Sequence, residues 1–190
     1  MSNNIILTGM PGSGKSTLLA RLVEKIPKKR GFLTREILNE EGQRVGFECV
    51  GDNDYTQRLA HVDFKDPINH QKRVGKYGVF VKGFEAFINQ RRFSDFSEGE
   101  ILYLDEIGQM QLYSEKFREL ARAYLDSENL FLGTLSELYH NDFTEEIRNR
   151  KDVDIFEITP ENRDCVLREL ENKCQIYRQS FFQNASLIIK

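Results

Sequence analysis

The sequence contains no tryptophan, only three cysteines and four prolines, and no long apolar run. The cysteines (Cys49, Cys165 and Cys174) are widely spaced and odd in number, so they exclude a disulfide framework and fit no zinc-binding pattern. No stretch approaches the roughly 20 apolar residues that a membrane-spanning helix needs. The N-terminus enters an apolar segment almost at once, which leaves no room for a signal peptide, and we therefore expect a cytoplasmic protein.

A strong charge of either sign is also lacking. With 27 Lys and Arg against 30 Asp and Glu, the net charge is −3, which argues against a broadly nucleic-acid-binding surface. Hydrophobic residues make up 39% and charged residues 30% of the 190 residues, a balance typical of a globular protein. We predict one domain over residues 1–190 without membrane association, and nothing in the sequence identifies a protein partner.

What the sequence does contain is a phosphate-binding loop, residues 9–16 (GMPGSGKS), which fits the pattern G-x-x-x-x-G-K-[ST]. A short apolar run, residues 5–7, precedes the loop and predicts a buried strand. Apolar residues at helical spacing follow it over residues 17–23. A strand, a glycine-rich loop and a helix in this order are the context that makes the pattern a nucleotide site.

The residue types of this loop have specific chemical roles. Glycines let the backbone N–H groups point inward, so that they and the helix N-terminus can hold phosphate oxygens. Lys15 is predicted to reach the β- and γ-phosphates, Ser16 to ligate Mg²⁺ and Thr17 to bond an α-phosphate oxygen. The residues predicted to bind nucleotide here are Gly9, Met10, Pro11, Gly12, Ser13, Gly14, Lys15, Ser16 and Thr17.

Beyond the first helix the pattern is rich in strand signals. Alternation over residues 31–38, a turn signal at 39–42 and a second strand at 45–50 predict a β-hairpin. A third strand is predicted over 56–64, so residues 31–64 form a β-rich insertion. Further on, residues 79–81 predict a short strand and residues 84–92 a helix.

From residue 101 onward, strands and helices alternate. Strands are predicted at residues 101–104, 130–134 and 153–158, and helices at 117–125, 143–150 and from near Pro160 to at least Cys174. Such alternation predicts a three-layer α/β P-loop NTPase fold with a mostly parallel sheet and helices on both faces. In the tail, residues 176–190, the run 187–189 (LII) favours a last strand or a docked tail.

Two acids, Asp105 and Glu106, end the strand predicted at 101–104. Ligands of open parallel sheets lie beyond the carboxyl ends of the strands, and the phosphate loop leaves its strand at that same edge. We predict that Asp105 joins Ser16 at the Mg²⁺ ion. Glu106 is predicted to orient or deprotonate the attacking water, which typically contributes about 10²–10⁴-fold.

The chain resembles the small cancer-related nucleoside-triphosphatases found in thermophilic microbes and vertebrates. The segments that carry this resemblance are residues 9–18, GFLTREI, GQRVGFECVG, RVGKYGV, DEIGQMQLYS, LGTL and ITPENRD, which span most of the chain in order. The resemblance implies a recombinase-like sheet and Mg²⁺-dependent hydrolysis of ATP, GTP and other triphosphates with modest base selectivity. Gln109 and Gln111 depart from the family pattern, in which Lys and Glu are usual.

The resemblance also implies roles for further residues. Thr134 would lie at a strand tip beside the γ-phosphate and sense the attacking water. Arg73 and Lys76 would neutralise charge in the transition state. Asn162 and Arg163 would border the base. Each assignment has a structural alternative, namely a strand-end threonine, a solvated turn and a helix-capping asparagine.

These features predict a nucleoside-triphosphate phosphohydrolase that cleaves the β–γ bond with Mg²⁺, with Lys15, Glu106 and Thr134 as catalytic residues. Two alternatives stay open. One is a P-loop kinase that phosphorylates a nucleoside or RNA end, with its acceptor held by the β-rich insertion. The other is a nucleotide-regulated interaction module in which slow hydrolysis acts as a timer.

Overall fold

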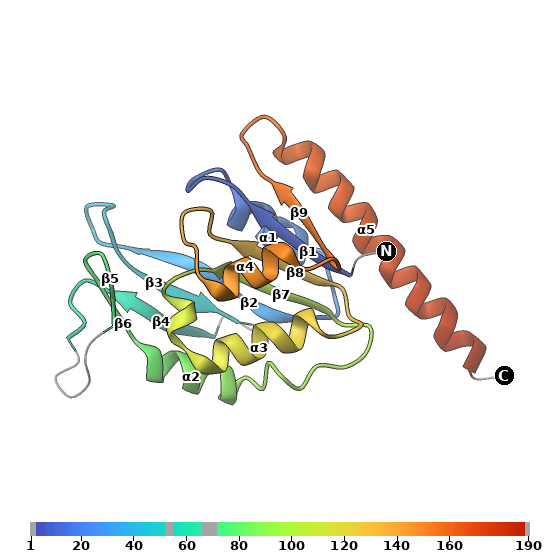
Figure 1. Ribbon diagram of the computed structural model, residues 1–190, viewed down its shortest axis with the longest axis horizontal. Helices are drawn as coiled ribbons and strands as arrows, with labels where there is room; N and C mark the ends of the chain where they lie inside the picture. The colour runs from blue at the N-terminus through green and yellow to red at the C-terminus, as the bar shows by residue number, and fades with distance from the viewer. Residues whose placement is uncertain (1–2, 52–54, 66–71, 189–190) are drawn as a thin grey trace.

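A computed structural model describes residues 3–51, 55–65 and 72–188, and within these ranges the strands form one nine-stranded sheet (Figure 1). The strand order is β5-β6-β4-β3-β2-β7-β8-β1-β9. The strands are β1 (Asn4–Thr8), β2 (Lys29–Leu38), β3 (Arg44–Val50), β4 (Thr56–His61), β5 (Arg73–Val74), β6 (Tyr77–Val79), β7 (Ile101–Ile107), β8 (Phe131–Leu135) and β9 (Val153–Glu157). The helices are α1 (Lys15–Glu24), α2 (Val81–Gln90), α3 (Glu115–Leu125), α4 (Asp142–Asn149), α5 (Arg163–Ile188) and the short 3₁₀ helix η2 (Gln111–Tyr113).

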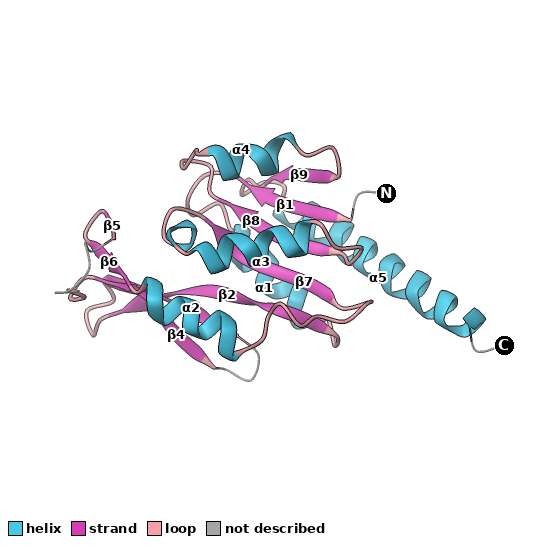
Figure 2. Ribbon diagram, turned by 60° about the horizontal axis from the view of Figure 1, so that its bottom comes forward, coloured by secondary structure: helices cyan, strands magenta, loops and turns pink. Residues whose placement is uncertain are grey.

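The half of the sheet that carries the phosphate loop is parallel, in the order β2-β7-β8-β1-β9. The side chains of its central strands β7, β8 and β1 are almost all buried, and they cover both faces because successive residues of a strand point to opposite sides. Ile5 and Leu7 pack with α1 and α5, whereas Ile6 packs in the cluster on the opposite face, with α2, α3 and α4. The predicted α/β architecture with helices on both faces is therefore confirmed (Figure 2).

The other half of the sheet is antiparallel, and β2 belongs to both halves. Residues 29–32 pair parallel with β7, and from Leu33 onward the same strand pairs antiparallel with β3. Gly31 permits this junction, since a Cβ at that position would lie only 1.8 Å from the carbonyl oxygen of Tyr103. The antiparallel pairing continues through β4 and β6 to β5, so the β-rich insertion lies directly beside the parallel strands.

Several predicted elements differ from the structure, and the strand predicted over 56–64 already ends at His61. The short strand predicted at 79–81 ends at Val79, and Val81 already begins α2. The predicted last strand at 187–189 is wrong, because residues 187 and 188 continue α5; residue 189 lies outside the described part of the chain. No glycine or proline interrupts residues 175–188, so nothing in that segment ends the helix. Figure 1 shows the last turns of α5 extending away from the sheet.

Phenylalanines fill the core beneath the acidic edge of β7. Phe32 is fully buried, and its ring centroid lies 5.4–6.1 Å from those of the four rings Phe84, Phe87, Phe93 and Phe117. Such tilted and edge-on contacts are favourable arrangements for aromatic pairs. Two residues further along β2, Thr34 contacts Asp105, so the packing of Phe32 fixes the strand that supports the acid.

All three cysteines are free, with Cys49 and Cys174 buried and Cys165 exposed. Among the described helices, none is both long and apolar enough to span a membrane.

Replacing Phe32 with alanine should therefore destabilise the fold. We expect a loss of about 3–5 kcal/mol in the free energy of unfolding, because the change opens a cavity among four neighbouring rings. Leu38→Ala, at a site 55% exposed on the same strand, serves as the control and should change stability by less than about 0.5 kcal/mol. Urea denaturation measures both values, and equal losses would contradict this account of the core.

Candidate active site

The phosphate loop forms a tight turn between β1 and α1. The backbone N–H of Ser13 donates to the carbonyl of Met10 at 3.1 Å, and Gly14 caps the helix with a φ of 99°. A side chain at Gly14 would meet the Arg163 side chain, whose Cδ lies 2.7 Å from the position of a Cβ. Glycine is therefore required there both for its backbone conformation and for space.

Lys15 lies at the N-terminus of α1 and folds back over the loop. Its Nζ donates to the carbonyl oxygens of Gly9 at 2.7 Å and Met10 at 3.0 Å. Partial burial lowers the pKa of Lys15, while Glu106 and Asp105 oppose this effect. The ammonium group is thus held at the loop by neutral carbonyl groups, which a phosphate group can replace as partners.

Asp105 brings the loop and the acidic strand together. Ser16 Oγ donates to Asp105 Oδ1 at 2.9 Å, and the Thr134 hydroxyl donates to the same oxygen at 2.8 Å. The second carboxylate oxygen accepts the Thr34 backbone N–H at 3.1 Å. Asp105 is fully buried, and its donors come from three different elements. A buried carboxylate must be satisfied in this way, and the arrangement fixes where Ser16 lies.

Glu106 occupies a β-bulge and a strained backbone conformation. Leu104 pairs with Gly133 and Ile107 with Leu135, so β7 advances by three residues where β8 advances by two. Within this bulge, Glu106 has a φ of 64°. Its backbone N–H donates to Thr134 Oγ1 at 2.6 Å. Non-glycine residues in this conformation are uncommon and cluster at functional sites, where the surrounding structure holds them in place. The strand predicted to end at residue 104 therefore continues to Ile107, with the acidic pair inside it.

The two carboxyl groups both have raised pKa values. Burial raises the pKa of Asp105, opposed by the hydrogen bonds from Thr134, Thr34 and Ser16. Burial, followed by the charge of Asp105, raises the pKa of Glu106 from its ordinary 4.5 to about 7, while Lys15 lowers it. A carboxyl group with a pKa near neutrality can exchange a proton at physiological pH, as a general base must.

Two adjoining cavities open onto these residues. One has a volume of about 310 Å³ and the other about 460 Å³, and Lys15, Ser16 and Glu106 line both. Thr17 and Thr34 line the smaller cavity, whereas the larger one extends under the β5–β6 hairpin. A third, smaller cavity of about 190 Å³ lies on the other side of the loop, against Gly14.

The protein oxygens at the acidic edge fit a divalent cation bound together with phosphate. Ser16 lines the smaller cavity, and its Oγ lies 2.9 Å from the buried Asp105 carboxylate directly behind it, so both are hard oxygen ligands at this edge. Within the described residues, no group of three or more His, Cys, Asp or Glu side chains could hold a metal ion alone. Mg²⁺ typically takes one or two protein oxygens and completes its shell with phosphate and water oxygens, which matches this donor set.

The remaining predicted residues lie in different places. In the part of the chain that the structure describes, neither Arg73 nor Lys76 lines these cavities. Arg73 donates to the Lys76 carbonyl at 2.7 Å, and the Lys76 ammonium lies over the Tyr77 ring. Asn162 shapes the turn before α5, since it accepts from the Thr159 N–H at 2.9 Å.

Other residues of the family motifs lie beside the two adjoining cavities or support the acids from behind. Arg163 lines the smallest cavity beside the loop, together with Pro160. Thr134 uses its hydroxyl to hold Asp105 and Glu106, and its role as a water sensor stays a prediction. Gln111 is buried and Gln109 bonds Tyr113, and among the described residues neither glutamine lines either of the two adjoining cavities.

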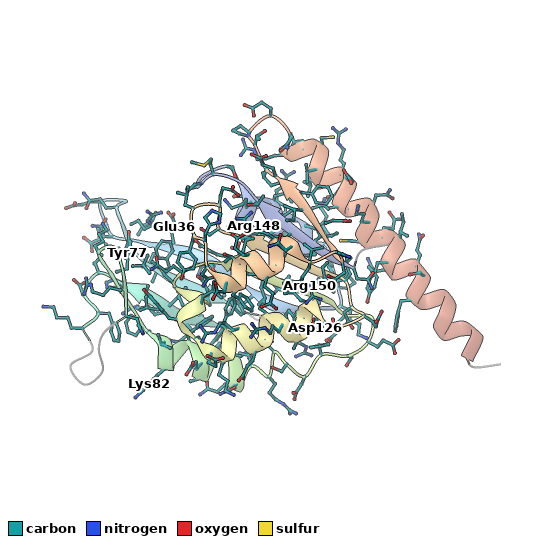
Figure 3. The ribbon with its side chains drawn as sticks, viewed as in Figure 1. Glu36, Tyr77, Lys82, Asp126, Arg148 and Arg150 are labelled. Atoms are coloured by element: carbon teal, nitrogen blue, oxygen red, sulfur yellow. The ribbon has the colours of Figure 1, made fainter. Side chains whose placement is uncertain are left out.

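Sequence reasoning missed several residues that line the larger cavity. Glu36, Arg44 and Phe47 come from the β-rich insertion, and no local motif marks them. Glu137 comes from the segment after β8, accepts a hydrogen bond from Thr8 and lies 3.6 Å from Arg148, the residue that Figure 3 labels on α4. Its position two residues beyond a parallel strand is a signal that could have identified it.

The strand–loop–helix unit and the acid on a nearby parallel strand define a P-loop nucleotide-binding protein of the α/β class. A family model described as NTPase matches residues 4–171, and the chain belongs to this family. The resemblance predicted from the motifs is thereby confirmed.

Relatives and solved structures agree with this assignment. The chain is 37% identical over 166 residues to nucleoside-triphosphatase THEP1 of Thermotoga maritima, covering 87% of this chain and 92% of that protein. It is 34% identical over 191 residues to the cancer-related nucleoside-triphosphatase of Homo sapiens, covering 94% and 100%. The crystal structure of THEP1 from Aquifex aeolicus matches with a TM-score of 0.75 and 33% identity, over 88% of this chain and 96% of that one.

The raised pKa of Glu106 predicts a pH-dependent gain in stability for Glu106→Gln. Because the folded state holds the proton more tightly, ionisation across the range from pH 4.5 to about 7 costs stability. Without metal or nucleotide, the variant should be more stable than the wild type at pH 8 by about 3 kcal/mol. The two proteins should be equally stable at pH 4, as measured by urea denaturation in the presence of a chelator.

Glu41→Gln, at an exposed position in the β2–β3 turn, is the matched control. This substitution should produce the same small difference at both pH values. If the stability difference between Glu106→Gln and the wild type does not change with pH, the surroundings do not raise the pKa of the Glu106 carboxyl group.

Proposed function

We propose that this protein is a nucleoside-triphosphate phosphohydrolase that cleaves the β–γ bond of ATP, GTP and other triphosphates with Mg²⁺. The observation that carries the proposal is the 2.9 Å hydrogen bond between Ser16 and Asp105, beside a Glu106 that faces both cavities. The names of the relatives, which are nucleoside-triphosphatases, support the same reaction. The cytoplasmic location remains a prediction from the sequence.

The proposed reaction divides its tasks among few residues. Lys15 would exchange its loop carbonyl partners for β- and γ-phosphate oxygens. Ser16 and Asp105 would hold Mg²⁺, which would supply charge neutralisation at those oxygens. Glu106 would accept a hydrogen bond from the water that attacks the γ-phosphorus in line with the leaving group. Thr134 would fix the positions of the two acids, because its hydroxyl donates to the Asp105 carboxylate and accepts the backbone N–H of Glu106.

The other end of the nucleotide would lie near the smallest cavity. This cavity is lined by Gly14, Thr17 and Leu18 of the loop and α1, and by Arg163 near the start of α5. Arg163 is exposed and offers a planar surface for stacking on a base of any kind. We therefore propose broad base selectivity, with Arg163 bordering the base and Asn162 shaping the turn that presents it.

A kinase is the second candidate, and the larger cavity is the observation that favours it. Its volume of about 460 Å³ exceeds the space that one water molecule requires, and insertion residues form part of its wall. Phosphate release from ATP and Mg²⁺ alone separates the two functions. A hydrolase releases phosphate without an acceptor, whereas a kinase releases none and instead forms ADP and a phosphorylated product when a nucleoside or an RNA end is added.

Glu106→Gln should abolish most turnover without loss of binding. We expect kcat to fall about 10²–10⁴-fold, because the amide cannot accept the proton of the attacking water. Affinity for a nonhydrolysable ATP analogue should change little. Phosphate release with each of the four ribonucleoside triphosphates measures the rate, and Glu41→Gln is the matched control. Unchanged turnover would remove Glu106 from the mechanism.

Lys15→Ala should weaken triphosphate binding selectively. The loss of one charge-assisted contact to phosphate should reduce ATP affinity by about 10–100-fold. Affinity for adenosine, which has no phosphate, should stay unchanged. Isothermal titration calorimetry with both ligands measures the difference, and Lys116→Ala, at an exposed position of α3 outside the cavities, is the control. Equal weakening for ATP and adenosine would contradict the phosphate contact.

A further inference from the structure

Two cationic side chains face the larger cavity in the part of the chain that the structure describes, and they are Lys15 and Arg44. Lys15 belongs to the phosphate loop, whereas Arg44 is the first residue of β3 in the insertion. The two therefore enter the cavity from different halves of the sheet. Arg73 and Lys76, for which the family resemblance implied charge neutralisation, do not line it.

Three contacts hold Arg44 in place. Its Nη1 donates to Glu36 Oε1 at 2.6 Å, and its Nε donates to the Tyr77 hydroxyl at 3.2 Å. The guanidinium also lies over the Phe47 ring at 5.2 Å. These partners come from β2, β6 and β3 itself, and Figure 3 labels Glu36 and Tyr77. The side chain is thus oriented before any ligand binds.

The contacts leave part of the guanidinium available. Within the described residues, Arg44 Nη2 forms no hydrogen bond, and 48% of the side chain is exposed. Arg44 lines the same cavity as Glu106 and Lys15. Arg44 is therefore within electrostatic reach of the carboxylate beside which the γ-phosphate would lie. A planar guanidinium is well suited to contact two phosphate oxygens at once.

We propose that Arg44 contacts the γ-phosphate from the insertion side and stabilises the charge that develops as the β–γ bond breaks. Glu36 and Tyr77 act as positioning residues for its guanidinium. The insertion would then supply a residue of the active site, and hydrolysis would need no arginine from a partner protein. This assignment rests on the proposed function, since it requires a triphosphate in the larger cavity.

Arg44→Ala tests the assignment against a closely matched control. Arg35 lies on the neighbouring strand β2, pairs with Glu48 at 2.8 Å, and is 61% exposed, outside the cavities. We expect kcat of Arg44→Ala to fall about 10²–10³-fold, as for loss of one transition-state donor. Affinity for a nonhydrolysable ATP analogue should stay within about threefold. Arg35→Ala should match the wild type in both measurements.

A second readout does not depend on turnover. ADP with aluminium fluoride mimics the transition state, so the wild type and Arg35→Ala should bind this complex more tightly than ADP alone. Arg44→Ala should lose that gain while it retains ADP binding. Arg44→Lys, which keeps the charge and perturbs the fold least, should lose most of it as well, because lysine lacks the planar fork.

The outcomes separate this proposal from the proposed function. If Arg44→Ala and Arg44→Lys match Arg35→Ala in kcat and in the fluoride complex, the role of Arg44 is overturned. If they weaken ATP-analogue and ADP binding equally with kcat unchanged, Arg44 only binds ground-state nucleotide and the proposal is also wrong. If the wild type releases no phosphate but binds the fluoride complex through Arg44, hydrolysis fails as the function while Arg44 keeps its assignment.

Discussion

The buried carboxylate of Asp105 is the constraint on which the rest of the site depends. A fully buried acid is costly unless donors surround it, and here the donors are Ser16, Thr34 and Thr134. They lie on α1, β2 and β8, so one carboxylate holds three elements in a fixed relation to β7. Ser16 is 89 residues away in the chain, and this single contact sets the phosphate loop against the acidic edge.

The junction strand β2 extends the same organisation into the insertion. Its first half pairs with residues 101–104 of β7, just before Asp105, and its second half carries Glu36 to the wall of the larger cavity. Phe32 anchors the first half in the aromatic core. The parallel half of the sheet thus supplies the loop and the acids, whereas the antiparallel half supplies Arg44 and the far wall.

Much of this arrangement could be predicted from the sequence, because it follows from rules about strand ends. The meeting of Ser16 with Asp105 follows from the common edge of parallel strands. The bulge at Glu106 could not be predicted, since no glycine marks its positive φ. Arg44 carries no local signal because it reaches the cavity through antiparallel pairing, whereas the role of Arg73 stays a prediction, and its side chain donates to the Lys76 carbonyl.

The most direct test of this account is a crystal structure with Mg²⁺ and a nonhydrolysable ATP analogue. The account predicts a metal ion about 2.1 Å from Ser16 Oγ, with Asp105 bound to it directly or through one water molecule. The γ-phosphate should then lie between Lys15 and Glu106. A triphosphate bound outside this region, or an Asp105 carboxylate turned away from the metal, would contradict the central claim.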